Sequence, residues 1–98
     1  MAESQRKHPL SWSRRSARDL LEIEAYIARD SQSAADDVIA EIIGKALLLE
    51  TNPSIGRLKR PTGYRELVLT RFPFTVIYRI KRNAVIVSRV LHQRRQFP

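Results

Sequence analysis

Cysteine is absent from this chain, and that absence excludes disulfides and cysteine-based metal sites. The two histidines, His8 and His92, lie far apart in the sequence, so we expect no bound metal ion. Glycine is scarce, and Gly44, Gly56 and Gly63 are too widely spaced to form a phosphate-binding loop. We therefore expect no cofactor and no specific small-molecule ligand.

Long apolar runs are also lacking. No uninterrupted apolar stretch is long enough to span a bilayer, and the N-terminus has no apolar segment of the signal-peptide kind. These absences predict a soluble cytoplasmic protein with no membrane partner. The 98 residues are enough for one domain, which we assign to 1–98, with 1–8 as a disordered polar arm.

Acidic residues are almost missing from the second half of the chain. Residues 57–98 hold eleven Lys or Arg and a single acid, Glu66, whereas residues 1–56 hold seven Lys or Arg and nine Asp or Glu. The net charge of +8 therefore comes from one contiguous stretch. Such a stretch predicts a surface that binds a polyanion or an acidic protein.

Two amphipathic helices are predicted in the first half. Ser13 is a suitable N-cap for the first, and Ser33 for the second, with Asp36 and Asp37 in its first turn. Apolar residues then recur at helical spacing: Ala17, Leu20, Leu21, Ile23, Tyr26 and Ile27 in the first helix, and Ala35, Val38, Ile39, Ile42, Ala46 and Leu49 in the second. The residues 30–33 form a short break, so the two helices should pair as an antiparallel hairpin.

Strands are predicted in the second half of the chain. Residues 64–69, 74–80 and 84–91 are rich in β-branched and aromatic residues, and residues 81–83 are suited to a hairpin turn. Residues 10–12 could add a short edge strand, and residues 53–63 read as a loop. In the last strand, Val85, Val87, Arg89 and Leu91 should share one face. The predicted class is α+β: a two-helix hairpin on a twisted antiparallel sheet of three to four strands.

Arginine is the residue type with the clearest chemical meaning here. Guanidinium groups bind phosphate and carboxylate in a bidentate manner, and six arginines lie on or beside the predicted strands: Arg65, Arg71, Arg79, Arg89, Arg94 and Arg95. A solvated strand face with cross-strand Arg–Glu pairs is the alternative. Because one acid cannot neutralise eleven cations, we favour an interaction surface.

Other candidate groups have simpler explanations. His92 could act as a general acid or base, but a lone histidine at a strand end more often packs or donates a hydrogen bond. Asp19, Glu22, Glu24 and Asp30 on the first helix are explained by capping and by the helix dipole. Aromatic residues that could stack on single-stranded nucleic acid are few, although charge alone allows nonspecific binding.

In their order and spacing, several short segments resemble the ParE/RelE superfamily of bacterial toxin–antitoxin toxins. They span nearly the whole chain: Trp12-Ser13, Ala17, Asp19-Leu20, Ile23, Tyr26-Ile27-Ala28, Pro53, Gly56-Arg57, Arg65-Glu66-Leu67, Arg71-Phe72-Pro73-Phe74, Ile77-Tyr78-Arg79, Val90-Leu91-His92 and Arg94-Arg95-Gln96-Phe97-Pro98. The resemblance implies the same helical hairpin on a sheet. It also implies a cognate ParD-like antitoxin whose C-terminal segment wraps the toxin.

The superfamily contains two activities. RelE-like members cut mRNA at the ribosome without a metal, whereas ParE-like members are not nucleases and poison DNA gyrase, leaving its DNA cleaved. By this resemblance, Thr75 stands where the nucleases usually carry a catalytic Arg, although Arg94 matches a second catalytic Arg position. The chain also stops before the tail on which some nucleases carry a catalytic Tyr. The ending with His92, Arg94 and Arg95 looks like ParE.

The sequence thus predicts a ParE-like toxin that binds gyrase and is not an enzyme. The expected target-binding residues are Arg65, Arg71, Arg79, Arg89, His92, Arg94 and Arg95. The expected antitoxin-binding residues are Leu21, Tyr26, Ile39, Ile43, Arg79 and Arg89. The main alternative is a ribosome-dependent mRNA endonuclease with Arg71, Arg79, His92 and Arg94 as its catalytic residues. A basic nucleic-acid-binding module is the third reading.

Overall fold

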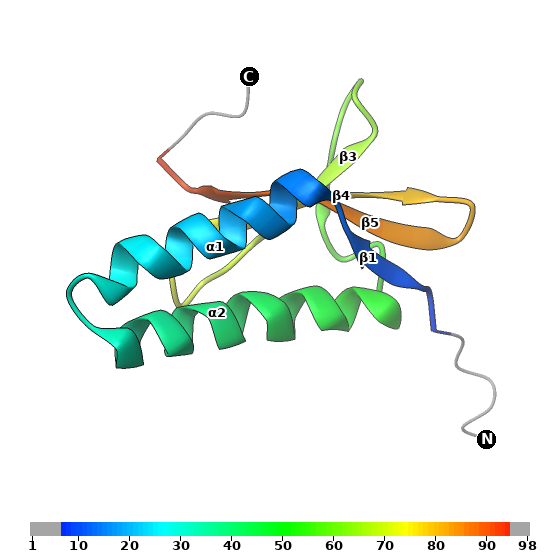
Figure 1. The fold of residues 1–98 in the computed structure, drawn as a ribbon. Helices are drawn as coiled ribbons and strands as arrows, with labels where there is room; N and C mark the ends of the chain where they lie inside the picture. The colour runs from blue at the N-terminus through cyan, green and yellow to red at the C-terminus, as the bar shows by residue number, and fades with distance from the viewer. Residues whose placement is uncertain (1–6, 95–98) are drawn as a thin grey trace.

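The computed structural model describes residues 7–94 as two helices and a five-stranded sheet (Figure 1). In chain order the elements are β1 (Leu10–Trp12), α1 (Arg14–Ala28), α2 (Gln32–Leu47), a 3₁₀ turn η2 (Leu48–Glu50), β2 (Arg57–Lys59), β3 (Tyr64–Val68), β4 (Phe74–Lys81) and β5 (Ala84–His92). Neither helix of the described part is long and apolar enough to cross a membrane. The two helices and the sheet confirm the predicted α+β class with a helical hairpin.

The sheet has the strand order β1-β5-β4-β3-β2. Strands β2 to β5 form an antiparallel meander, and β1 pairs in parallel with β5, placing Leu10 opposite Val85 and Trp12 opposite Val87. The edge strand at Leu10–Trp12 is confirmed. The sheet has one strand more than the three to four predicted, because residues 57–59 were assigned to a loop. The parallel pairing of β1 with β5 is the one departure from the predicted antiparallel arrangement. Strand β2 is short and charged, and its pairing with Tyr64–Glu66 across a tight turn defines it as a strand.

The helix starts follow local side-chain capping. Ser13 accepts a hydrogen bond from the backbone N–H of Ser16 at 3.0 Å, as predicted for the N-cap of α1. The N-cap of α2 is Ser31, which accepts from the backbone N–H of Ala34 at 3.1 Å, so the prediction of Ser33 was wrong. Ser31 takes an extended backbone directly after the turn, which starts α2 at Gln32 and moves Asp36 out of its first turn.

The core lies between the inner face of α2 and one face of the sheet. Of the predicted stripe, Ala35, Val38, Ile42 and Ala46 are buried on α2 and Leu49 is buried on η2, whereas Ile39 is only partly buried. The sheet contributes Val76, Tyr78, Val85, Val87 and Val90. Helix α1 is covered less: its buried residues are Ser16 and Asp19, and Leu21 and Tyr26 of its predicted apolar stripe are 66% and 70% exposed. Part of the apolar surface of α1 therefore faces solvent.

The predicted hairpin turn between β4 and β5 is confirmed. Arg82 and Asn83 both have positive φ, 51° and 68°, as a two-residue type I′ turn requires. The predicted disordered arm was wrong at His8, whose backbone N–H donates to the carbonyl of Glu50 at 2.7 Å. His8 Nδ1 also lies 3.0 Å from the carbonyl oxygen of Asn83. Residues 1–6 of that arm lie outside the described part of the chain.

Candidate functional site

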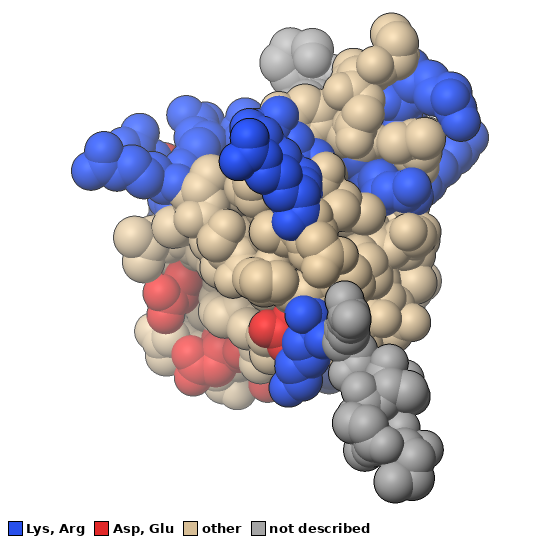
Figure 2. Space-filling view, turned by 90° about the vertical axis from the view of Figure 1, so that its right-hand side faces the viewer, with Lys and Arg blue, Asp and Glu red and all other residues tan. Residues whose placement is uncertain are grey.

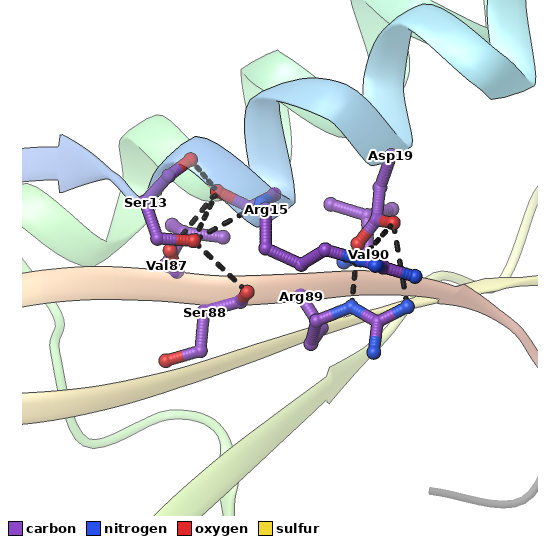
Figure 3. Close-up of polar contacts among 8 residues, drawn as sticks. Ser13, Arg15, Asp19, Val87, Ser88, Arg89 and Val90 are labelled. Atoms are coloured by element: carbon purple, nitrogen blue, oxygen red, sulfur yellow. Dashed lines mark hydrogen bonds and ion pairs between the residues drawn. The ribbon is translucent and has the colours of Figure 1, made fainter.

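Strand β5 carries a bulge that helix α1 fills. Ile77 pairs with Arg89 and Tyr78 pairs with Val87, so Ser88 is an extra residue without a partner on β4. The N-terminus of α1 supplies donors there. Ser13 Oγ donates to the carbonyl of Ser88 at 3.0 Å (Figure 3). Ser16 Oγ donates to the carbonyl of Val87, also at 3.0 Å.

The bulge also changes which residues of β5 face the core. Val90 is 2% exposed and joins Val85 and Val87 in the core, so the predicted strict alternation through Arg89 and Leu91 was wrong. One extra residue shifts the alternation of side chains by one position, and the chain beyond Ser88 follows the shifted register.

Asp19 continues the contact between α1 and β5. Its Oδ2 accepts from the backbone N–H of Val90 at 2.9 Å and from Arg89 Nε at 2.8 Å, while its Oδ1 lies 3.4 Å from Arg89 Nη2 (Figure 3). Arg15 Nε lies 3.5 Å from the same Oδ1. The Asp19 side chain is 5% exposed. Sequence reasoning assigned Asp19 to helix capping and missed this role, because its partners lie about seventy residues away.

An open cleft of about 730 Å³ lies beside this ion pair, between α1 and the C-terminal end of β5. Its apolar lining includes Ile23, Tyr26, Ile27, Val38, Phe74, Val90 and Leu91. Its polar lining comprises three arginines, Arg15, Arg89 and Arg94, the side chain of His92, and two acids, Asp19 and Glu22. Because Asp19 is already paired with Arg89, the remaining charge at the cleft favours an anionic ligand that also carries apolar groups.

The structure brings together some of the predicted target-binding residues at this cleft. Arg89, His92 and Arg94 line it, and His92 packs edge-on against Phe74 with ring centroids 5.4 Å apart. The Nδ1 atom of His92 accepts from the backbone N–H of Arg94 at 3.1 Å. Arg95, predicted to act with Arg94, lies outside the described residues.

Three other predicted arginines lie away from the cleft. Arg65 Nη1 donates to the carbonyls of Ser54 and Gly56, at 3.2 and 2.9 Å, and so braces the loop after η2. Arg71 stacks on Phe72 and lies 3.8 Å from Glu41 Oε1. Arg79 lies over the ring of Tyr64, 5.7 Å from its centroid. The seven predicted residues therefore do not form one site. Figure 2 shows most of the Lys and Arg side chains of one face over its upper part, with acidic side chains and one further basic group below them.

The predicted antitoxin-binding residues also divide. Tyr26 and Arg89 line the cleft, whereas Leu21 is exposed elsewhere on α1. Ile39 packs against the core, and Ile43 is 38% exposed on α2.

Tyr78 fixes the loop that Arg65 braces. Its hydroxyl donates to the carbonyl of Pro53 at 2.7 Å and accepts from the backbone N–H of Gly56 at 2.8 Å. Burial raises the pKa of Tyr78 above its ordinary value of 10.0, and the Gly56 hydrogen bond and the Arg65 charge oppose that shift. Gly56 is required here because a Cβ at this position would overlap the Tyr78 side chain.

Metal chemistry has no visible site in residues 7–94, where no group of three or more His, Cys, Asp or Glu side chains converges. The arrangement that is present is a cationic, partly apolar cleft, which is suited to binding a protein segment.

Comparison with known proteins agrees with this architecture. The solved structure of the chromosomal ParDE TA system from P. aeruginosa has a TM-score of 0.78 and 27% identity, over 88% of this chain and 96% of the matched chain. The structure of the toxin-antitoxin complex RelBE2 from Mycobacterium tuberculosis has a TM-score of 0.66 over 88% of this chain and 98% of the matched chain; at 20% identity it shows the fold alone. These likenesses place the fold among the ParE/RelE toxins.

Sequence comparison is more specific. The family described as ParE toxin of type II toxin-antitoxin system, parDE, matches residues 10–97. A Sinorhizobium fredii protein named "Putative toxin Y4kP" is 39% identical over 89 residues, which cover 91% of this chain and 92% of that protein. This chain belongs to the ParE toxin family of type II toxin–antitoxin systems.

Proposed function

We propose that this toxin binds DNA gyrase, traps the gyrase complex with cleaved DNA, and acts as a protein ligand instead of an enzyme. The observation that carries the proposal is the match to the ParE family over residues 10–97. ParE-like members of the superfamily poison gyrase, as noted above. The basic second half of the chain supplies the charged surface for such an encounter.

The environment of the arginines favours a binding role over phosphodiester cleavage. Arg89 is engaged by Asp19 and Arg71 by Glu41, so these cations are paired within the chain. The Nδ1 atom of His92 is occupied by the backbone N–H of Arg94. Thr75, at the position where the nucleases usually carry an Arg, is uncharged and 9% exposed. Cleavage would need a general base next to two arginines that are not already paired. These described groups do not form such an arrangement.

We also propose that a ParD-like antitoxin inhibits the toxin by placing an acidic, partly apolar segment in the cleft. The P. aeruginosa and M. tuberculosis relatives were solved as toxin–antitoxin systems. The exposed ring of Tyr26 and the partly buried side chains of Ile23 and Ile27 offer apolar contact, and Arg15 and Arg94 offer charge at the rim. The apolar contacts would contribute affinity, and the charges at the rim would orient the bound segment.

The decisive experiment adds purified chain to gyrase, supercoiled DNA and ATP, and scores trapped cleaved DNA. A ribosome programmed with mRNA is tested in parallel. Cleaved DNA with intact mRNA is expected. Cut mRNA with unaffected gyrase would overturn the proposal and indicate that the chain is a ribosome-dependent mRNA endonuclease.

Variants then locate the surface. Arg94→Ala combined with Arg95→Ala should abolish gyrase poisoning, whereas Arg14→Ala, an exposed cation at the start of α1, should preserve it. Thermal unfolding of each variant checks that the fold is intact. Full poisoning by a stable double variant would refute the assignment of these two arginines.

A further inference from the structure

The two faces of the sheet differ in what they contact. One face carries the core residues Val76, Tyr78 and Val87, against which both helices pack. Side chains alternate along each strand, so the residues between these core positions point to the opposite face. Figure 1 shows α2 on one side of the sheet and the turn between β2 and β3 projecting on the other. This second side of the sheet is the outer face.

The outer face and the two turns that border it carry six exposed cations, which we call the outer basic face. Its members are Arg57 and Lys59 on β2, Arg60 in the β2–β3 turn, Arg79 and Lys81 on β4, and Arg82 in the β4–β5 turn. Lys59 pairs with Tyr64 across the strands, and the Arg79 guanidinium lies over the Tyr64 ring, 5.7 Å from its centroid. These contacts place the cations of β2 and β4 on the same side of β3.

The charge of the outer basic face is not neutralised within the chain. Glu66 is the only acid between residues 57 and 94, and it lies 3.9 Å from the Nζ of Lys59, whose side chain is 50% exposed. Such an exposed pair contributes only about 0–1 kcal/mol. Six cations and one acid leave a net charge of +5 on one surface. Because like charges repel and disfavour the compact state, this arrangement is best explained by an anionic partner.

The cations are spread over the surface instead of converging on one point. Arg79 and Lys81 are two residues apart on β4, which separates their Cα atoms by about 7 Å. Strand β3 lies between β2 and β4, so the cations of these two strands are about 10 Å apart across the sheet. A single small anion cannot reach all of them. A chain of regularly repeated negative charges can, and the phosphate backbone of a nucleic acid is such a chain.

The apolar content of the outer face separates a nucleic acid from an acidic protein. Thr75, Ile77 and Leu91 lie on this side but are only 9%, 2% and 8% exposed. Among the described residues of this face, Val68 is the only large apolar side chain classed as exposed. Protein interfaces have an apolar centre that is depleted of charge, whereas interfaces with nucleic acid are polar and positively charged. The cleft beside α1 fits the first description, and the outer basic face fits the second.

We infer that the outer basic face binds the phosphate backbone of duplex DNA. The choice of duplex DNA rests on the proposed function, because gyrase holds and cleaves duplex DNA. Contacts to phosphates carry no sequence information, so this binding is independent of DNA sequence. The toxin would then contact gyrase and the DNA held by gyrase in one complex, while the cleft stays available to the antitoxin.

Fluorescence anisotropy of a short labelled DNA duplex, with the full chain and no gyrase, tests the inference. The logarithm of the association constant should fall with the logarithm of salt concentration with a slope of about −4 to −5, since each phosphate contact contributes about −0.9. Arg79→Ala combined with Lys81→Ala should reduce this slope by about 2 and lower affinity at 0.1 M salt by about tenfold or more. Absence of binding at low salt would overturn the inference.

A matched control removes the same charge elsewhere. Arg29→Ala combined with Lys45→Ala takes two cations from the helical hairpin, and it should change the affinity by less than about threefold. Equal weakening by the two double variants would indicate diffuse attraction to a basic protein and overturn the inference. Melting temperatures of all variants check that the fold is retained.

Two comparisons define the ligand and the contact. Arg79→Lys keeps the charge and should keep the salt slope, whereas Arg79→Ala should reduce it by about 1. If both variants lost affinity equally, stacking on Tyr64 and not a phosphate contact would account for Arg79, which would contradict the inference. Tighter binding of single-stranded DNA or RNA of the same length would refute the assignment to duplex DNA.

Because the chain has no cysteine, one introduced thiol can carry a photoreactive cross-linker. Ser11 is exposed on β1 and pairs with Ile86, whose partner on β4 is Arg79, so Ser11 lies on the outer face. The cross-linker on Ser11→Cys should capture the labelled duplex. The same reagent on Ala40→Cys, exposed on α2, should not. Equal capture from both positions would overturn the inference.

The gyrase assay distinguishes failure of this inference from failure of the proposed function. DNA binding through the outer basic face with no effect on gyrase would refute the proposed function and leave this inference standing. Undiminished poisoning by Arg79→Ala with Lys81→Ala would overturn the inference that this face acts on DNA held by gyrase, and the proposed function would stand. If the double variant bound DNA normally but lost affinity for DNA-free gyrase, the face would be a protein contact and the inference would be wrong.

Discussion

The contact between Asp19 and Arg89 gives the sharpest test of how α1 is held on the sheet. Replacing Asp19 with alanine removes the acceptor of the buried Val90 N–H and the partner of Arg89, whose side chain is 21% exposed. An unsatisfied buried donor costs about 1–3 kcal/mol, and breaking a buried ion pair costs about 3–5 kcal/mol. Because Arg89 keeps some contact with water, we expect the unfolding free energy to fall by about 3 kcal/mol.

Related variants divide this effect into its parts. Asp19→Asn keeps an oxygen for the Val90 N–H and loses the charge, so it should cost about 1–2 kcal/mol. Arg89→Ala leaves the carboxylate bonded to Val90 N–H with Arg15 nearby, and we expect a similar cost. The double variant Asp19→Ala with Arg89→Ala should then show a coupling energy of about 1–2 kcal/mol.

Urea unfolding, followed by the fluorescence of the single tryptophan Trp12, measures these values. For a domain of this size 1 kcal/mol corresponds to about 4–8 °C in melting temperature, so Asp19→Ala should lower it by roughly 12–24 °C. Glu22→Ala removes the same charge from an exposed position one turn away and should stay within about 0.5 kcal/mol of wild type. If Asp19→Ala matched Glu22→Ala, or if the coupling were zero, the reasoning would be refuted.

Three further predictions concern other contacts with the sheet. Gly56→Ala should lower the unfolding free energy by about 1–3 kcal/mol, because its Cβ would overlap the Tyr78 side chain; calorimetry measures this, with Gly44→Ala as the unhindered control. The raised pKa of Tyr78 means that the folded chain holds this proton more tightly than the unfolded chain. Stability from Tyr78 is therefore complete below pH 10 and declines as pH rises further, and Tyr78→Phe should flatten that decline in urea titrations across this range. Ser16→Ala removes the hydroxyl that donates to the Val87 carbonyl and should cost about 1–2 kcal/mol by urea unfolding; an unchanged midpoint would contradict a role in holding the bulge.

Local signals in the sequence were sufficient for much of the fold. Ser13 begins α1 because its hydroxyl caps a nearby N–H, and Asn83 suits the β4–β5 turn because it tolerates positive φ. The buried stripe of α2 was predicted from its helical periodicity. The helix cap, the turn and the stripe were all predictable because each depends on residues within a few positions of one another. Residues Ser31 and Ser33 show the limit, since both are good caps and the choice depended on where the turn placed the backbone.

The candidate site was less accessible to such reasoning. The arginines were recognisable as candidates, and Arg89, His92 and Arg94 do line one cleft, but Arg65 and Arg79 lie elsewhere. Arginine count and position along the strands give no information on which of them share a face once the sheet is assembled. The wall that α1 contributes, with Arg15 at the rim, was missed because the orientation of the hairpin on the sheet is a tertiary property.

The sequence by itself determined the helices, most of the strands, the basic second half and the resemblance to the ParE/RelE toxins, because short-range spacing and composition carry that information. Only the tertiary structure decided that Ser88 bulges from β5, that Asp19 reaches Arg89 and Val90, and that β2 pairs with β3. It also decided which apolar face of α2 is buried, leaving Ile43 and Leu47 exposed. These outcomes depend on groups distant in the chain meeting across the core, and local periodicity does not encode those meetings.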